Sequence, residues 1–368
     1  MIMKRILFLT PFAPSNNAGA ENFTRLLLKH LSKSFKVDLV YFRYVDDIAY
    51  ECPNENVRVV KEVTNSTIVK LRNAIMYPFV HPIFSVRFDR KLLYFIQDLV
   101  KKNSYNLLFL DHSQMALYGK FFPDVRKILM SHDVMAQRFA RTGNWLNRKL
   151  VVAGERKMMH LKNTTVFSFS EKDRKIIYET YGIDSKVTNF FLDNKIIDAT
   201  PSKIEKRIVF IGKWKRLDNF EGLKWFFDTV YNHIEKTIEI CIIGKWLPTD
   251  FQNLILSYSN VHYLGFVENP YPLIANSIAT ISPLFSGAGV KVKVVESIAC
   301  GTPVIGTEIA FEGISEKYSQ MMILANNADE YVKALKEIIS LEERQNIKKN
   351  FISNYISDSI PEFLKTIL

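Results

Sequence analysis

Residues 279–307 read ATISPLFSGAGVKVKVVESIACGTPVIGT, and this stretch contains one complete strand–loop–helix–strand unit. Short apolar runs at 279–284 and 302–307 predict two buried strands. The segment between them predicts a helix that begins near Val290 and ends at Gly301, because Pro303 prevents its continuation. Two strands joined through a helix are typical of a parallel sheet with a right-handed crossover.

The loop of this unit combines small side chains with charged ones. Small residues allow a backbone to approach a ligand closely, and they fill four consecutive positions: Ser286, Gly287, Ala288 and Gly289. Lys291 and Lys293 are expected in the first helical turn, where cations oppose the helix dipole unless an anion is also present. Glu296 follows at a distance that suits the hydroxyls of a ribose. The pattern predicts a nucleotide diphosphate site; an ion pair between Lys293 and Glu296 on a solvated helix face is the alternative.

The same alternation of strands and helices occurs twice in the 368 residues. Apolar strands are predicted in the first half at 4–9, 37–42, 106–110, 127–130 and 165–169. They are predicted in the second half at 207–212, 238–244, 261–266, 279–284 and 302–307. The fold class is therefore α/β, with two doubly wound Rossmann-like domains, 1–195 and 205–340, facing across a cleft. We expect ligands beyond the carboxyl ends of the strands.

Composition restricts the class of protein. A hydrophobic content of 48%, without an apolar run long enough to span a bilayer, indicates a soluble protein. We see no signal peptide, and three unpaired cysteines fit the cytoplasm. The net charge of +11 predicts an anionic partner, but the chain lacks nucleic-acid-binding signatures. The seven histidines do not fall into metal-ligand spacing, so we predict no metal.

Other strand ends carry candidate groups. Gly19 follows the first strand and precedes a helix, although the loop lacks the glycine fingerprint of dinucleotide-binding proteins. His112 and His132 each follow a strand directly, where an imidazole could bind a substrate hydroxyl or simply pack. Lys213 follows the strand at 207–212 and could bind a phosphate or lie in a solvated turn.

These motifs together resemble the GT-B retaining glycosyltransferases of the large family 4-like group. The resemblance rests on PFAPSNNAGAENFTRLLLKHL (11–31), FSFSEKDRKIIYETYG (167–182), IGKWKRLDNFEGLKWFFDTV (211–230), LGFVENPYPLIANSIATISPL (264–284) and the stretch quoted first. It implies that the first domain binds the acceptor and the second binds a nucleotide-sugar. It also implies that a C-terminal helix at 341–368 crosses back onto the first domain.

The resemblance assigns roles to individual positions. Gly19 matches a glycine at the donor phosphates, and His112 matches a histidine that reaches the transferred sugar. Gly265, Phe266 and Val267 match the segment beside the base. Residues 286–289 border the sugar and diphosphate, and Glu296 matches the ribose-binding acid. One departure concerns position 288, where relatives often carry an acid and this chain has alanine.

The implied activity is transfer of a sugar, with retention and without a cofactor, to a hydroxyl of a glycan or lipid-linked acceptor in bacterial surface polysaccharide synthesis. Lys213, Lys291 and Lys293 are expected to stabilise the departing diphosphate. A non-catalytic nucleotide-sugar-binding partner and a GT-B epimerase are the alternatives. Residues 68–102 mix apolar and basic side chains. They either hold the enzyme at the anionic inner leaflet or form internal helices.

Overall fold

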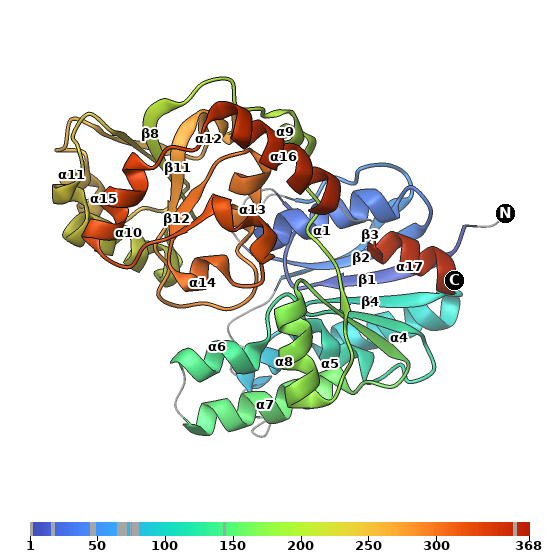
Figure 1. Cartoon of the computed structure of the whole chain (residues 1–368). Coiled ribbons are helices and arrows are strands. Elements are labelled where there is room, and N and C mark those ends of the chain that lie inside the picture. Colours follow the sequence, from blue (N-terminus) through green and yellow to red (C-terminus); the bar gives the residue numbers. More distant parts are fainter. Residues whose placement is uncertain are drawn as a thin grey trace. The chain divides into compact units, whose positions relative to one another are not determined.

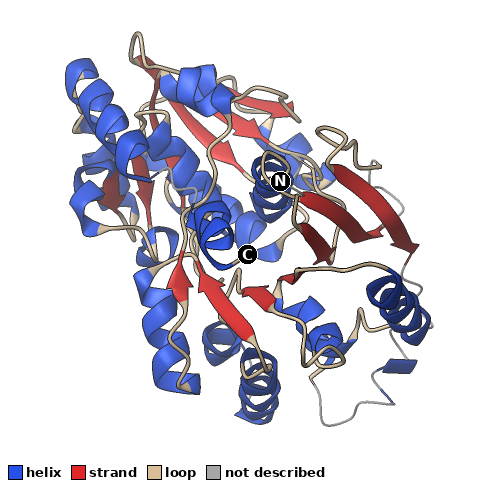
Figure 2. Ribbon diagram, turned by 90° about the vertical axis from the view of Figure 1, so that its right-hand side faces the viewer, coloured by secondary structure: helices blue, strands red, loops and turns tan. Residues whose placement is uncertain are grey.

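The computed structural model describes residues 3–15, 19–44, 49–64, 72–73, 75, 81–142, 145–355 and 359–368. The chain forms two compact units. The first comprises Met1–Phe191 and Ser357–Leu368, and the second comprises Leu192–Ile356. Each unit is an α/β domain with its own parallel sheet, as the ribbons in Figures 1 and 2 show. The two-sheet fold class expected from the sequence is therefore confirmed.

The first unit is built on a seven-stranded sheet in the order β3-β2-β1-β4-β5-β6-β7. Its strands are β1 Arg5–Thr10, β2 Lys36–Arg43, β3 Val57–Thr64, β4 Leu107–Asp111, β5 Lys127–Met130, β6 Thr164–Ser168 and β7 Lys186–Val187. Its helices are α1 Gly19–Leu31, α3 Pro82–Ser85, α4 Arg90–Lys102, η1 Ser113–Met115, α5 Ala116–Gly119, α6 Met135–Thr142, α7 Trp145–Met159, α8 Glu171–Tyr181 and α17 Ser359–Ile367. Helices cover both faces, so the central strands are apolar without alternation, as in Ile6–Leu9 of β1.

The second unit has a six-stranded sheet in the order β10-β9-β8-β11-β12-β13. Its strands are β8 Glu205–Ile211, β9 Glu239–Ile243, β10 Val261–Gly265, β11 Ser277–Ser282, β12 Val304–Gly306 and β13 Met322–Leu324. Its helices are α9 Asn194–Asp198, α10 Leu217–Thr229, η2 Tyr231–His233, α11 Thr249–Ile255, α12 Tyr271–Ala275, α13 Val292–Ala299, α14 Glu308–Phe311, η3 Glu316–Met321, α15 Ala328–Lys336 and α16 Leu341–Tyr355. A separate apolar core fills this unit.

Strand order determines where each unit can bind a ligand. The chain moves outward in one direction from β1 and in the other from β4, so the order reverses between these two neighbours. The second sheet reverses in the same way between β8 and β11. At such a switch point the two following loops diverge and leave a crevice at the carboxyl edge of the sheet. The loops after β1 and β4, and those after β8 and β11, are therefore the positions to search.

The end of the chain differs from the single helix expected over 341–368. α16 belongs to the second unit, whereas α17 belongs to the first. Two buried cations hold α16 in place. Arg344 donates to the carbonyls of Ser277 and Ile278 at 2.7 Å each, and burial lowers its pKa to about 10. Lys348 donates to three carbonyls, those of Ile196, Ala199 and Ala299, at 2.9–3.0 Å.

The basic and apolar segment 68–102 lies partly outside the described residues, which omit 68–71, 74 and 76–80. Its described helix α4 places Leu92, Leu93 and Ile96 in the core of the first unit, as the internal-helix alternative predicts. Among the described residues, the structure contains no helix that is both long and apolar enough to cross a bilayer.

Candidate active site

The loop after β11 places two glycines of positive φ directly before a helix. Gly287 and Gly289 have φ of 118° and 69°, a region in which side chains other than glycine are strained. α13 begins at Val292, two residues later than expected, so Lys291 occupies the N-cap position and Lys293 lies in the first turn. Cys300 is the C-cap, and Gly301 follows with φ of 78°, as the sequence predicted. The glycines are thus required by the shape of this loop.

Lys291 is directed back toward its own loop. Its Nζ donates to the carbonyls of Gly289 at 2.6 Å and Ala288 at 3.3 Å, and lies 3.8 Å from a carboxylate oxygen of Glu312. The Lys291 and Glu312 side chains are each only 11% exposed. An ammonium group has three protons, and all three have acceptors nearby. A phosphate that approaches Lys291 therefore competes with groups of the protein.

Lys293 connects the loops at the switch point of the second sheet. Its Nζ donates to Asn219 Oδ1 at 3.0 Å, and Asn219 donates to the carbonyl of Lys213 at 3.2 Å. Burial lowers the pKa of Lys293 to about 8, against the opposing effect of Asp218. Lys293 is therefore a cation at neutral pH that loses its proton under mildly alkaline conditions.

Glu296 lies one turn farther along α13 and accepts a hydrogen bond from the Tyr271 hydroxyl at 3.3 Å. Burial raises the pKa of Glu296 to about 7, and nearby Asp193 adds to this rise. Lys293 pairs with Asn219 and Glu296 with Tyr271, so the alternative ion pair between Lys293 and Glu296 is wrong. Glu296 is a carboxylate that ionises near neutral pH.

The neighbouring strands contribute aromatic groups and further cations. Gly265, with φ of 62°, ends β10, and Phe266 and Val267 follow it. The Phe266 ring is exposed, with Lys245 Nζ 4.4 Å from its centre. Lys213 Nζ lies 5.0 Å from the centre of the exposed Trp246 ring. Sequence reasoning missed Lys245 and Trp246, although their position directly after β9 was a signal.

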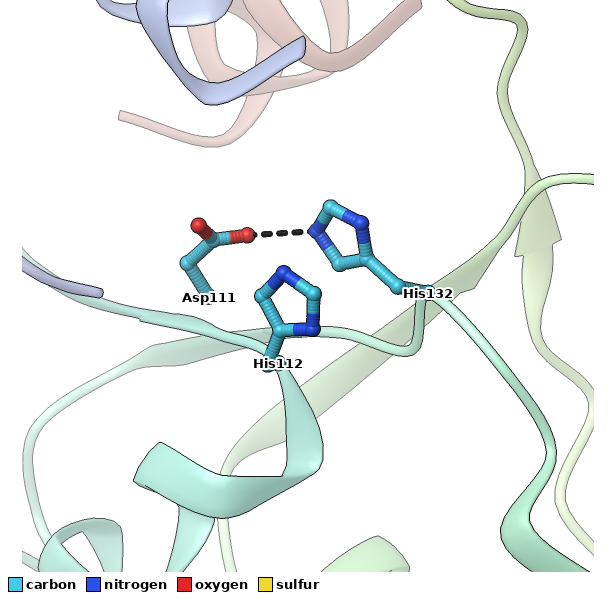
Figure 3. A group of neighbouring side chains, drawn as sticks. All are labelled: Asp111, His112 and His132. Atoms are coloured by element: carbon cyan, nitrogen blue, oxygen red, sulfur yellow. Dashed lines mark hydrogen bonds and ion pairs between the residues drawn. The ribbon is translucent and has the colours of Figure 1, made fainter. Parts of the chain in front are cut away.

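In the first unit, Asp111 ends β4 and organises a buried network. Its Oδ2 accepts hydrogen bonds from the hydroxyls of Thr10 at 2.9 Å and Thr24 at 2.7 Å. Its Oδ1 lies 2.7 Å from Nε2 of His132, the contact drawn in Figure 3. Burial alone would raise the pKa of Asp111, but His132 and the hydrogen bonds that Asp111 accepts from His132 and Thr24 bring it below its ordinary value. The network joins the ends of β1, β4 and β5 through one ionised carboxylate.

His112 lies against this network, and Figure 3 shows its ring beside that of His132. The two rings stack with centres 3.4 Å apart and planes inclined by 9°. His112 has φ of 66°, a strained value for a residue with a side chain, and its buried Nε2 has no hydrogen-bond partner. Burial lowers the pKa of His112 well below its ordinary value. A neutral imidazole with a free nitrogen therefore lies at the switch point beside β1.

Asp111, His112 and His132 form the only group of potential metal ligands found among the described residues. The geometry does not suit an ion. Imidazole binds a metal through a lone pair in the plane of its ring, and two nearly parallel stacked rings cannot direct both lone pairs to one point. The carboxylate is also already engaged by three donors. The cluster fits a hydrogen-bonding role better than a metal centre.

The predicted site residues therefore gather at two places. Lys213, Lys291, Lys293, Glu296 and residues 286–289 lie around the switch point of the second sheet, and Gly265–Val267 follow its strand β10. His112 lies at the switch point of the first sheet. Gly19 begins α1 in that unit, and residues 16–18 before it lie outside the described residues.

Comparison with known proteins bears on the segment that contains the switch point of the second sheet. Residues 205–340 match the family model described as glycosyl transferases group 1. These residues are therefore similar to a group 1 glycosyltransferase domain. The matched segment contains all the candidate phosphate-binding lysines as well as Glu296. A protein of Klebsiella pneumoniae described as "Uncharacterized 44.6 kDa protein in cps region" is 20% identical over 238 residues, which are 56% of this chain and 61% of that protein.

Solved structures extend the likeness to the whole fold. WaaG, a glycosyltransferase involved in lipopolysaccharide biosynthesis, is similar with a TM-score of 0.66 at 14% identity, covering 98% of this chain and 99% of WaaG. Sucrose-phosphate synthase from Thermosynechococcus elongatus is similar with a TM-score of 0.70 at 11% identity, covering 99% of this chain and 98% of the synthase. Anabaena HepE, in complex with UDP and glucose, is similar with a TM-score of 0.69 at 13% identity, covering 99% of this chain and 98% of HepE. The two units are thus the Rossmann-like domains of the GT-B fold, as expected.

Proposed function

We propose that the protein is a nucleotide-sugar-dependent glycosyltransferase whose second unit binds the donor. The segment 286–296 carries the proposal: a loop with two glycines of positive φ, two lysines and a partly buried carboxylate follow the strand at the switch point. In this proposal the diphosphate lies at the N-terminus of α13, beside Lys293 and Lys213. Glu296 binds the ribose hydroxyls, and Phe266 and Trp246 offer exposed ring faces to the base.

The chemistry of transfer requires stabilisation of a departing nucleoside diphosphate. The leaving group gains negative charge as the bond to the sugar breaks, so fixed cations and helix N–H groups lower the barrier. Lys293 suits this role because Asn219 holds its ammonium group in place without neutralising it. Lys291 takes part once the diphosphate has competed successfully with the loop carbonyls and Glu312.

The first unit is proposed to contribute His112 and the acceptor. The unpartnered Nε2 of the neutral imidazole can exchange a hydrogen bond with a sugar hydroxyl. His132 stacks on this ring and is itself held in place by its hydrogen bond with Asp111. We propose a hydroxyl of a glycan or lipid-linked molecule as acceptor, transfer with retention, no metal or other cofactor, and a role in surface polysaccharide synthesis. The net charge of +11 supports residence in the cytoplasm at an anionic inner leaflet.

A panel of nucleotide-sugars tested for protection against thermal unfolding, followed by transfer assays with the best donor, tests the proposal. Protection by one donor, loss of that protection in Glu296→Ala, and release of its nucleoside diphosphate with an acceptor extract are expected. Binding without consumption of the donor would instead establish a nucleotide-sugar-binding protein that does not catalyse transfer. Protection by no member of the panel would refute the proposal.

A further inference from the structure

A carboxylate lies next to a lysine that is expected to meet a diphosphate. Glu312 Oε2 is 3.8 Å from Lys291 Nζ, and both side chains are largely shielded from solvent. Sheet pairing brings the two groups together: β11 and β12 are neighbours, with Ser282 opposite Gly306, so the loops that follow them are adjacent. Glu312 is the C-cap of α14 in the second of these loops. Its position is therefore a result of the fold and not of sequence proximity.

The negative charge of Glu312 repels the proposed diphosphate. Such a charge is unexpected if the site is required only to bind this ligand tightly. Lys291 would attract a diphosphate more strongly without Glu312, because two opposite charges close together largely cancel at a distance. Asp218 is a second acid near the same loop, with its Oδ2 3.9 Å from the place where a Cβ on Gly287 would lie. Asp218 already forms a two-point ion pair with Arg216, whereas Glu312 acts on Lys291.

Substrate and product differ in charge. The diphosphate of a nucleotide-sugar is esterified at both ends and carries about two negative charges. Once the sugar has left, the terminal phosphate gains a second ionisable oxygen with a pKa of about 6, so the product carries about three charges above that pH. A fixed carboxylate near the diphosphate therefore repels the product more strongly than the donor.

We propose that Glu312 is a specificity-determining residue that makes the site prefer the nucleotide-sugar over the free nucleoside diphosphate. This inference rests on the proposed function. The Lys291–Glu312 pair attenuates the positive charge at loop 286–289, so that the donor binds and the more anionic product leaves. The same pair lowers the affinity of the site for both ligands.

The test compares the affinities of UDP and UDP-glucose, or of the matching GDP or dTDP pair if the donor panel selects it. Glu312→Gln preserves the shape and removes the charge. It should tighten the binding of UDP roughly threefold more than that of UDP-glucose at about 0.1 M salt. The product inhibition constant should fall accordingly. At pH 5.5, where about three quarters of the terminal phosphate of UDP is protonated, this difference between the two ligands should become much smaller.

Two variants provide matched controls. Glu312→Asp keeps the charge and should keep the wild-type ratio of the two affinities. Glu308→Gln removes an equal charge from an exposed position on α14 and should leave the ratio unchanged. Equal changes for UDP and UDP-glucose in Glu312→Gln would overturn the inference and assign Glu312 a purely structural role. Wild-type protein that binds no nucleotide of the panel would remove the proposed function and this inference together.

Discussion

Replacing Glu296 by glutamine should stabilise the protein at alkaline pH while it weakens nucleotide binding. Burial raises the pKa of Glu296 from 4.5 to about 7, so the folded state binds more protons than the unfolded state between these values. Stability therefore falls as pH rises through this window. At 1.36 kcal/mol per pKa unit, the ionised carboxylate costs about 3 kcal/mol at pH 8 and about 1 kcal/mol at pH 5. Glutamine does not ionise and can still accept the hydrogen bond of Tyr271.

Urea unfolding at pH 5 and pH 8 measures this difference. Three of the four tryptophans, Trp214, Trp225 and Trp246, lie in the second unit, so fluorescence reports mainly on the unit that contains Glu296. The free energy of unfolding of the variant should exceed that of wild type at both pH values, and this excess should be about 2 kcal/mol larger at pH 8 than at pH 5. Glu308→Gln, on an exposed side chain, controls for the loss of one charge. A constant difference between variant and wild type at both pH values would refute the reasoning.

Three further outcomes are expected. Lys293→Met should weaken nucleoside diphosphate binding about tenfold, measured by titration calorimetry. Wild-type affinity should decline above pH 8 as Lys293 loses its proton, and this decline should be absent from the variant. A decline of equal size in both proteins would exclude Lys293 as its source. Asp111→Ala leaves the hydroxyls of Thr10 and Thr24, and His132, without their acceptor. The free energy of unfolding, measured by urea titration, should fall by about 3 kcal/mol. A fall below about 1 kcal/mol would contradict the role given to this network. Gly244→Ala places a Cβ 1.7 Å from the Gly212 carbonyl oxygen and should lower the melting temperature strongly. Gly182→Ala is the control, because Gly182 also has a positive φ but has open space around it, and it should lower the melting temperature far less. Similar losses in the two variants would show that the clash at Gly244 is relieved at little cost.

The sequence predicted the central strands well because burial on both faces produces unbroken apolar runs. It missed β3, β7 and β13, which are edge strands of the two sheets. β3 has one buried residue, Val57, and its other residues are exposed or partly exposed without strict alternation. β7 and β13 have only two and three residues. Such segments do not carry the apolar signal of a doubly covered strand. The alternation of strands and helices was nevertheless sufficient to predict two doubly wound domains.

Local pattern also predicted the candidate site, but not the partners of its residues. Gly287, Gly289 and Lys293 could be selected from spacing, because strand, loop and helix follow one another directly. The proximity of Glu312 to Lys291 depends on the pairing of β11 with β12, which no window of sequence contains. The bond between Asp111 and His132 likewise requires β4 and β5 to be neighbours. Burial of Arg344 could not be foreseen, because α16 is rich in charged residues and resembles a surface helix.

The two buried cations of α16 bear on how the segment matched by the family model can be excised as a folded fragment. The family match ends at residue 340, yet Arg344 supplies donors to carbonyls of β11, and Lys348 supplies them to the ends of α9 and α13. A fragment cut at the limits of the match, 205–340, would lose these donors together with α9. Three buried carbonyl groups of the fragment, those of Ser277, Ile278 and Ala299, would then lose these donors, and Ala299 lies at the end of the helix that carries Glu296. A fragment that retains its shape has to run from about residue 192 through α16, so the recognisable family segment is shorter than the unit that folds.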